Sequence, residues 1–190
     1  PKGAFILEEP NKPTVKKEIE VSFHKQNIHL VLHALASVLG FNIINTTDMG
    51  QTRIDSLNAA SVGSDTNRRY IVEQPHNVVN INYKGRADKL LRHLSNLTGY
   101  FFAQDGNTIV VKPNETFSVL VPQYEELLNQ IESTVYLLGG QEISYDKLSS
   151  HLSFKCNYKN FKKIKKYLTH LRDNANLVSL RVVLLNLQYS

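Results

Sequence analysis

Near the start of the chain, the spacing of apolar residues changes from a two-residue period to the three- and four-residue spacing of a helix. Ile19, Val21 and Phe23 are separated by polar residues, which is the two-residue period of a strand with one buried face. Directly afterwards, over residues 28–39, apolar side chains recur at three- and four-residue spacings, which predicts an amphipathic helix. A short strand is predicted at residues 41–45, so the order strand, helix, strand opens the first folded region.

The same order is predicted again after a polar stretch. Residues 46–77 are rich in Ser, Thr, Asn, Asp and Gly without a sustained period, which predicts a long loop. Alternation returns at residues 79–83, and a helical stripe follows at residues 90–97. Two further strands are predicted to form a hairpin through Asp105 and Gly106, a dipeptide favoured in tight turns.

A second region is predicted at residues 115–190. An alternating strand opens it, and a helix follows over residues 124–138. Two short strands precede a helix over residues 158–172, and the apolar run at residues 177–189 is interpreted as a closing strand. Because that run stops without a terminating signal, we expect the natural polypeptide to continue past Ser190.

These elements predict an α+β fold of two small domains, each with a short mixed sheet and two helices. Residues 1–17 form an extended lead-in, residues 18–113 the first domain and residues 115–190 the second. The 190 residues are 42% hydrophobic and 21% charged, which is ordinary for a globular protein and argues against a disordered or fibrous chain. No run of about 18 apolar residues predicts a membrane-spanning helix.

Charge is distributed unevenly along the chain. The net charge is +5, and seven basic residues with no acidic one lie between Lys155 and Arg172, so the remainder carries a net charge of −2. The basic character therefore belongs to the helix predicted over residues 158–172. A solvated lysine face is the commonest meaning of such a helix, and an electrostatic partner surface is the alternative.

The two helices of the second region carry opposite charges. If both cover one face of the sheet, neighbouring copies would meet acidic helix to basic helix, a head-to-tail contact that closes into a ring when the rotation allows. The candidate interface residues are Glu125, Glu126, Glu132, Lys162, Lys163 and Lys166.

The sequence offers no catalytic constellation. The phosphate-binding glycine motifs and the GxSxG nucleophile motif are absent, so we expect no enzyme activity and no cofactor. His29 and His33 are four residues apart near His24, a spacing compatible with a metal, but without a third ligand a solvated or partner-facing helix surface is favoured. Cys156 is the single cysteine, which excludes an internal disulfide, and its strand parity points it inward.

Three stretches carry a family resemblance: IEVSFHKQNIHLVLHALASVLGFNII at 19–44, ADKLLRHLSNLTGYFF at 87–102 and DGNTIVVKP at 105–113. Together they resemble the short N-terminal domain (STN domain) shared by bacterial secretins and TonB-dependent transducers. The loop at residues 46–77 is longer than that family's usual connection. In the second region, ETFSVLVPQYEELLNQIES and NANLVSLRVVLLNLQ resemble the KH-like ring-building domain of secretins, type IVb pilus secretins in particular.

This resemblance implies the periplasmic N-terminal part of an outer-membrane secretin channel. Its expected partners are further copies in a homo-oligomeric ring, an inner-membrane platform protein, and the pilin or secreted substrate that passes through. Contact with the membrane is expected only through a barrel or lipid anchor outside these residues. The expected location is the periplasmic side of the bacterial outer membrane.

Other interpretations stay open. The edge of the first strand, around Val21 and Phe23, is a candidate to accept a partner strand. An accessory ring subunit of another envelope-spanning secretion system fits the same residues. A nucleic-acid-binding module would use the basic helix over residues 158–172, although the GXXG clamp of KH domains and an RNP aromatic strand are both absent.

Overall fold

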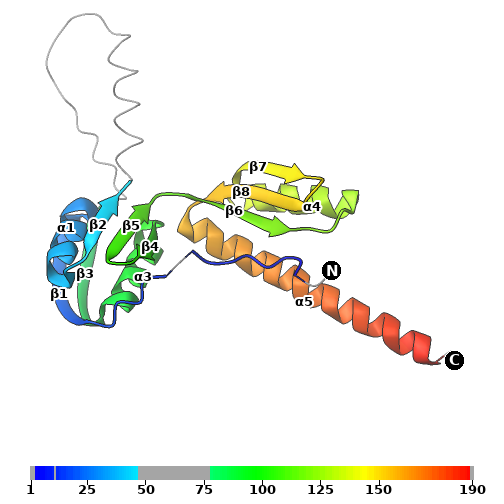
Figure 1. The fold of residues 1–190 in the computed structure, drawn as a ribbon, viewed down its shortest axis with the longest axis horizontal. Helices are drawn as coiled ribbons and strands as arrows, with labels where there is room; N and C mark the ends of the chain where they lie inside the picture. Colours follow the sequence, from blue (N-terminus) through cyan, green and yellow to red (C-terminus); the bar gives the residue numbers. More distant parts are fainter. Residues whose placement is uncertain (1–2, 11, 47–77, 189–190) are drawn as a thin grey trace, which may run out of the picture. The chain divides into compact units, whose positions relative to one another are not determined.

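The structure is a computed structural model that describes residues 3–10, 12–46 and 78–188, with side chains described to residue 174. The chain divides into two compact units (Figure 1). We call residues 10–113 the first unit, and residues 1–9 together with 114–190 the second unit. Residues 47–77, almost all of the predicted loop, lie outside the described residues.

The first unit confirms the predicted repetition of strand, helix and strand. Its elements are β1 (Glu18–Asn27), α1 (Ile28–Leu39), β2 (Asn42–Asn45), β3 (Val78–Arg86), α3 (Ala87–Thr98), β4 (Phe101–Asp105) and β5 (Thr108–Lys112). β1 and β3 form an antiparallel pair, and β2, β5 and β4 form a mixed sheet in that order.

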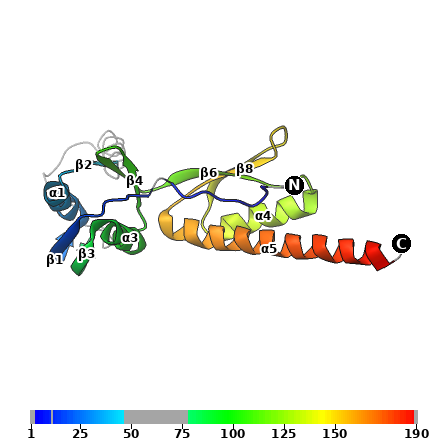
Figure 2. The same ribbon diagram turned by 60° about the horizontal axis from the view of Figure 1, so that its bottom comes forward.

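The two helices of the first unit lie between these two sheets (Figure 2). Leu35 of α1 and Leu94 of α3 are completely buried, and both sheets contribute to the same core, for example through Ile81 and Ile109. Burying one such side chain stabilises a fold by about 1.5–3 kcal/mol. The amphipathic stripes read from the sequence are therefore the surfaces that join the layers.

Local signals end the elements where the sequence places them. The Asn27 side chain accepts a hydrogen bond of 2.9 Å from the His29 backbone N–H, which caps α1. Gly40 follows with a left-handed φ of 70°, and its N–H donates to the Ala36 carbonyl. Gly106, with φ 54°, turns the chain between the antiparallel strands β4 and β5, which confirms the predicted hairpin.

The second unit has one sheet with both helices on one face (Figure 2). Its strands are antiparallel throughout, in the order β6, β8, β7. Phe117 lies 4.6 Å from Phe161 and 5.8 Å from Phe154 between ring centroids, so aromatic packing joins the sheet to a helix. The elements are β6 (Glu115–Leu120), α4 (Glu125–Leu137), β7 (Gln141–Asp146), β8 (His151–Cys156) and α5 (Tyr158–Gln188).

The closing strand predicted at residues 177–189 is wrong, because α5 continues from Tyr158 to Gln188. No Gly or Pro interrupts this interval, and its leucines favour a helix. A short apolar run does not by its period alone distinguish a buried strand from a helix. The α+β class is confirmed, with a three-stranded sheet in the described part of the second unit.

Candidate functional site

The strand β1 carries the candidate partner-strand residues. Val21 and Phe23 are half-buried and pack against the core of the first unit, while Ser22 between them is exposed. Among the strands that the structure describes, β1 pairs with β3 alone, so backbone groups along its other edge have no strand beside them. Among the described strands β1 is therefore an edge strand, with Val21 and Phe23 turned toward the core.

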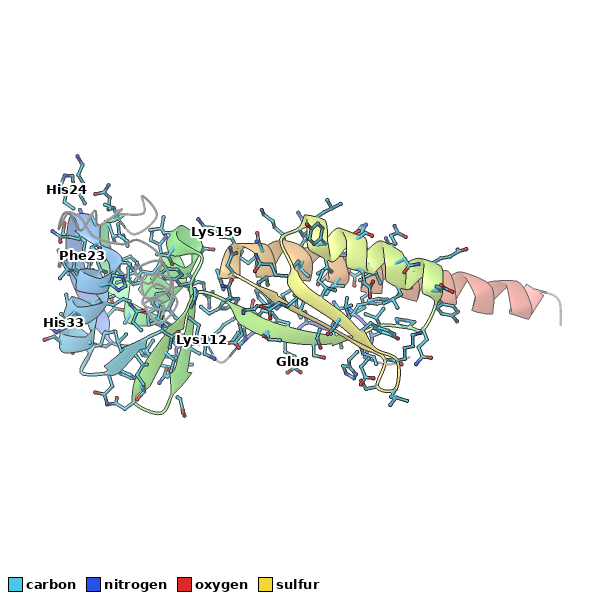
Figure 3. All side chains as sticks on the ribbon, turned by 90° about the horizontal axis from the view of Figure 1, so that it is seen from above. Glu8, Phe23, His24, His33, Lys112 and Lys159 are labelled. Atoms are coloured by element: carbon cyan, nitrogen blue, oxygen red, sulfur yellow. The ribbon has the colours of Figure 1, made fainter. Side chains whose placement is uncertain are left out.

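A bulge limits the length of this edge. The pairing of β1 with β3 shifts register between Phe23 and Gln26, and Lys25 within the bulge has a left-handed φ of 47°. The Lys25 N–H donates a 2.6 Å hydrogen bond to the Asn80 side chain. His24, labelled beside Phe23 in Figure 3, belongs to the same interruption. Pairing without interruption covers residues 18–23, and it resumes at Gln26 and Asn27 after the bulge.

The acidic candidates lie on α4. Glu125 and Glu126 occupy its first turn, where carboxylates interact favourably with the positive end of the helix dipole. Glu125 and Glu132 also line a groove of about 540 Å³ beside the edge strand β7, together with Leu128 and Ile143. The sequence indicated the acidic helix. The groove depends on the position of β7 beside this helix, and no local sequence pattern predicts that position.

The basic candidates lie on α5. Lys162, Lys163 and Lys166 are exposed. Lys165 differs, because its Nζ lies 3.3 Å from Oε1 of Glu9 and 5.7 Å from the centroid of the Phe161 ring. The helix thus offers an outward lysine face and one lysine that holds a segment from the start of the chain.

That segment is residues 3–9, which we call the strap. It runs beside β6 and α5 of the second unit (Figure 1). Phe5 and Leu7 are only 5% exposed, whereas Ile6 is 46% exposed and Glu8 points outward (Figure 3). The strap was predicted as part of an extended lead-in, and its run of apolar residues from Ala4 to Leu7 does not by itself indicate which of them are buried.

Neither the histidines nor the cysteine forms a chemical site in the described part of the chain. His29 Nδ1 lies 2.6 Å from the Asn45 side-chain nitrogen, and His33 lies on the outer side of α1 (Figure 3). No group of three metal-ligating side chains occurs among the described residues. Cys156 is buried as predicted, and burial raises the pKa of its thiol to about 12, which keeps it protonated and unreactive at neutral pH.

The helices of the described residues include none that is both long and apolar enough to cross a membrane. No family model matches the chain, and no curated protein matches it.

Solved structures with a similar arrangement come from secretion systems. One is the crystal structure of the enterotoxigenic Escherichia coli GspC-GspD complex from the type II secretion system, with 11% identity, a TM-score of 0.26, and coverage of 82% of this chain and 98% of that chain. A second is a dimeric cysteine mutant of the N-terminal domain of the secretin XcpQ from Pseudomonas aeruginosa, with 9% identity, a TM-score of 0.27 and coverage of 81% of this chain.

A further XcpQ structure is 10% identical, with a TM-score of 0.27 and coverage of 82% of this chain. The present chain spans 64% and 66% of the lengths of the two XcpQ chains.

Proposed function

We propose that this chain is the periplasmic N-terminal part of an outer-membrane secretin subunit that serves type IV pilus assembly or protein secretion. The observation that supports it is that the stretches with the family resemblance fold together in the first unit. The three stretches that resemble the secretin N-terminal domain, at residues 19–44, 87–102 and 105–113, supply both helices and four of the five strands of one common core, to which β3 also contributes. The three stretches that carry the resemblance therefore belong to one folded unit with a common core.

The proposed ring contact uses the second unit. Both helices cover one face of its sheet, which is the arrangement that the acidic-to-basic hypothesis required. We propose that the lysine face of α5 in one copy meets the α4 groove lined by Glu125 and Glu132 in the next. Such charge complementarity orients neighbours and accelerates their encounter.

Charge reversal tests this contact. The change of Lys162, Lys163 and Lys166 to Glu is expected to weaken self-association measured by sedimentation, most strongly at low salt. A control with Lys16, Lys89 and Arg92 changed to Glu has the same net charge and should assemble normally, because all three are exposed on the first unit. Unchanged assembly of the first variant would remove this interface.

The proposed contact with an inner-membrane platform protein uses the free edge of β1. Because residues 18–23 retain regular geometry, an added partner strand would protect their backbone amides from exchange. Hydrogen exchange that stays unchanged at residues 18–24 with the platform protein bound would contradict this role.

The family itself is tested in cells. An antibody against this chain should detect a multimer in the outer-membrane fraction, accessible from the periplasm in spheroplasts. Recovery as a cytoplasmic monomer bound to nucleic acid would instead support the alternative based on the exposed lysines of α5. Binding would then weaken linearly on a logarithmic scale of salt concentration, by several counterions.

A further inference from the structure

The strap lies against the second unit, with a turn at residues 3–5 followed by residues 6–9, which belong to no helix or strand. Phe5, Leu7 and Glu9 face the unit. Phe5 and Leu7 are each 5% exposed, and the Glu9 side chain is 22% exposed. Ile6 and Glu8 face away from it. From Phe5 to Glu9 the side chains therefore alternate, as they do in a strand added to a sheet edge, whereas Ala4 beside Phe5 is also buried.

Two elements of the second unit hold the strap. The edge strand β6 accepts a 3.0 Å hydrogen bond at its Leu120 carbonyl from the Phe5 N–H. The helix α5 supplies Lys165, whose Nζ lies 3.3 Å from the Glu9 carboxylate. A hollow of about 450 Å³ lies beside the strap, lined in part by Thr116 and Ser118 of β6. Backbone, apolar and charge recognition thus act on one short segment.

The strap is joined to this site through the whole first unit, because more than a hundred residues of chain separate Glu9 from β6. Its position therefore depends on noncovalent contacts. Phe5 adopts a left-handed φ of 61°, which is rare for a bulky residue and persists only where surrounding contacts hold it. These observations describe a tethered segment held against β6 and α5 by noncovalent contacts.

We propose that β6 and α5 form a peptide-binding site for extended segments with the pattern apolar, any, apolar, any, acidic. In the structure the site holds residues 3–9 of its own chain, and its occupant in trans is the same segment of a second copy. Charge and apolar complementarity are identical for both, so the tether alone favours the strap already in place. The inference does not depend on the secretin proposal.

The site is tested with the full chain and a labelled synthetic peptide, PKGAFILEE, which stands for the strap of a second copy. The double variant Phe5→Asp, Leu7→Asp removes the chain's own strap from the site without altering β6 or α5. By fluorescence anisotropy we expect this variant to bind the peptide at least about tenfold more tightly than the wild-type chain, whose tethered strap competes intramolecularly for the same site.

Charge reversal gives the matched control. A peptide with Lys in place of Glu9 should bind the double variant more weakly than the original peptide does. Adding Lys165→Glu to the double variant should reverse that preference, which a general loss of structure would not produce. A scrambled peptide should not bind.

Three results would overturn the proposal: no binding by a double variant with intact circular dichroism, equal binding by the wild-type chain, or a peptide preference that does not reverse with Lys165→Glu. If the double variant does not fold, the chain with Glu9→Lys replaces it. That chain should bind the peptide more tightly than wild type, and equal affinity would count against the site.

Discussion

The two units complete their cores in different ways. The first unit encloses α1 and α3 between two sheets, all built from residues of one continuous stretch apart from the undescribed interval. The second unit has one sheet, two helices on one of its faces, and a strap. The strap precedes the first unit in the sequence, whereas the rest of the second unit follows it. A core of local elements is recognisable from sequence patterns, whereas a core that uses a distant segment is not.

The largest expected effect on stability comes from truncating one buried side chain in each core. Phe154→Ala in β8 removes a completely buried ring that contacts Phe117, and should lower the free energy of unfolding of the second unit by about 3–5 kcal/mol. Leu94→Ala should cost the first unit about 2–5 kcal/mol. Cys156, the only cysteine and buried in the second unit, allows the two to be followed separately by its alkylation rate in urea.

If the units unfold separately, Leu94→Ala leaves the alkylation of Cys156 unchanged while Phe154→Ala accelerates it. Equal acceleration by both changes would mean that the units share one unfolding transition, and the comparison between them would fail.

A smaller effect compares two glycines that follow helices. Gly139, with φ 95°, has the Asn160 side chain where a Cβ would lie, while Gly40, with φ 70°, has open space there. Gly139→Ala should therefore cost about 2–3 kcal/mol from strain and overlap, and Gly40→Ala about 1 kcal/mol from strain alone. Thermal unfolding of both variants provides the measurement. Equal losses would show that the packing around Gly139 adjusts without cost.

Substitutions at the N-cap residues of α1 and α4 are expected to change stability in opposite directions, each by about 1 kcal/mol. Asn27→Ala removes the side-chain cap of α1 and should destabilise the first unit by about 1 kcal/mol. Tyr124, at the start of α4, gives no side-chain cap and is 71% exposed, so Tyr124→Ser should stabilise the second unit by about 0.5–1 kcal/mol. Urea unfolding checks both. A loss of stability in Tyr124→Ser would show that its ring makes a contact worth more than a cap.

The smallest effect concerns the turn between β7 and β8. Hydrogen bonds from the Ser149 hydroxyl and the Leu148 N–H hold the pKa of Asp146 below its ordinary value. Because the folded pKa is the lower one, the ionised carboxylate supports the turn above the unfolded pKa, and this support is lost as pH falls through the folded pKa. Ser149→Ala should raise the pKa of Asp146 in an NMR titration, and an unchanged pKa would contradict the role of the hydroxyl.

Most of the first unit was predictable because its signals are local. The cap at Asn27, the left-handed Gly40 and the turn at Gly106 each act within a few residues. The apolar stripes of both helices match the buried positions except at their ends, where Val38 and Leu97 are exposed. The same short-range alternation placed the candidate residues Val21 and Phe23 on a strand, whereas its position at a sheet edge follows only from the pairing of the strands.

The remaining features depend on distant contacts. Lys165 belongs to the same basic run as its exposed neighbours, and only the position of Glu9 gives it a different environment. The groove at Glu125 and Glu132 likewise exists because β7 lies beside α4. The strand predicted at residues 177–189 failed for another reason, since a run of leucine and valine has no period that excludes a helix.

The position of the strap also has a consequence for the order of events during synthesis. A ribosome makes residues 3–9 before the first unit, and the surface that holds them is complete only after Lys165 has been added. The first unit can fold before that surface is complete, because domains generally fold as units. Phe5 and Leu7 must meanwhile remain in water, and closing the strap is a late, long-range step that slows the completion of the second unit.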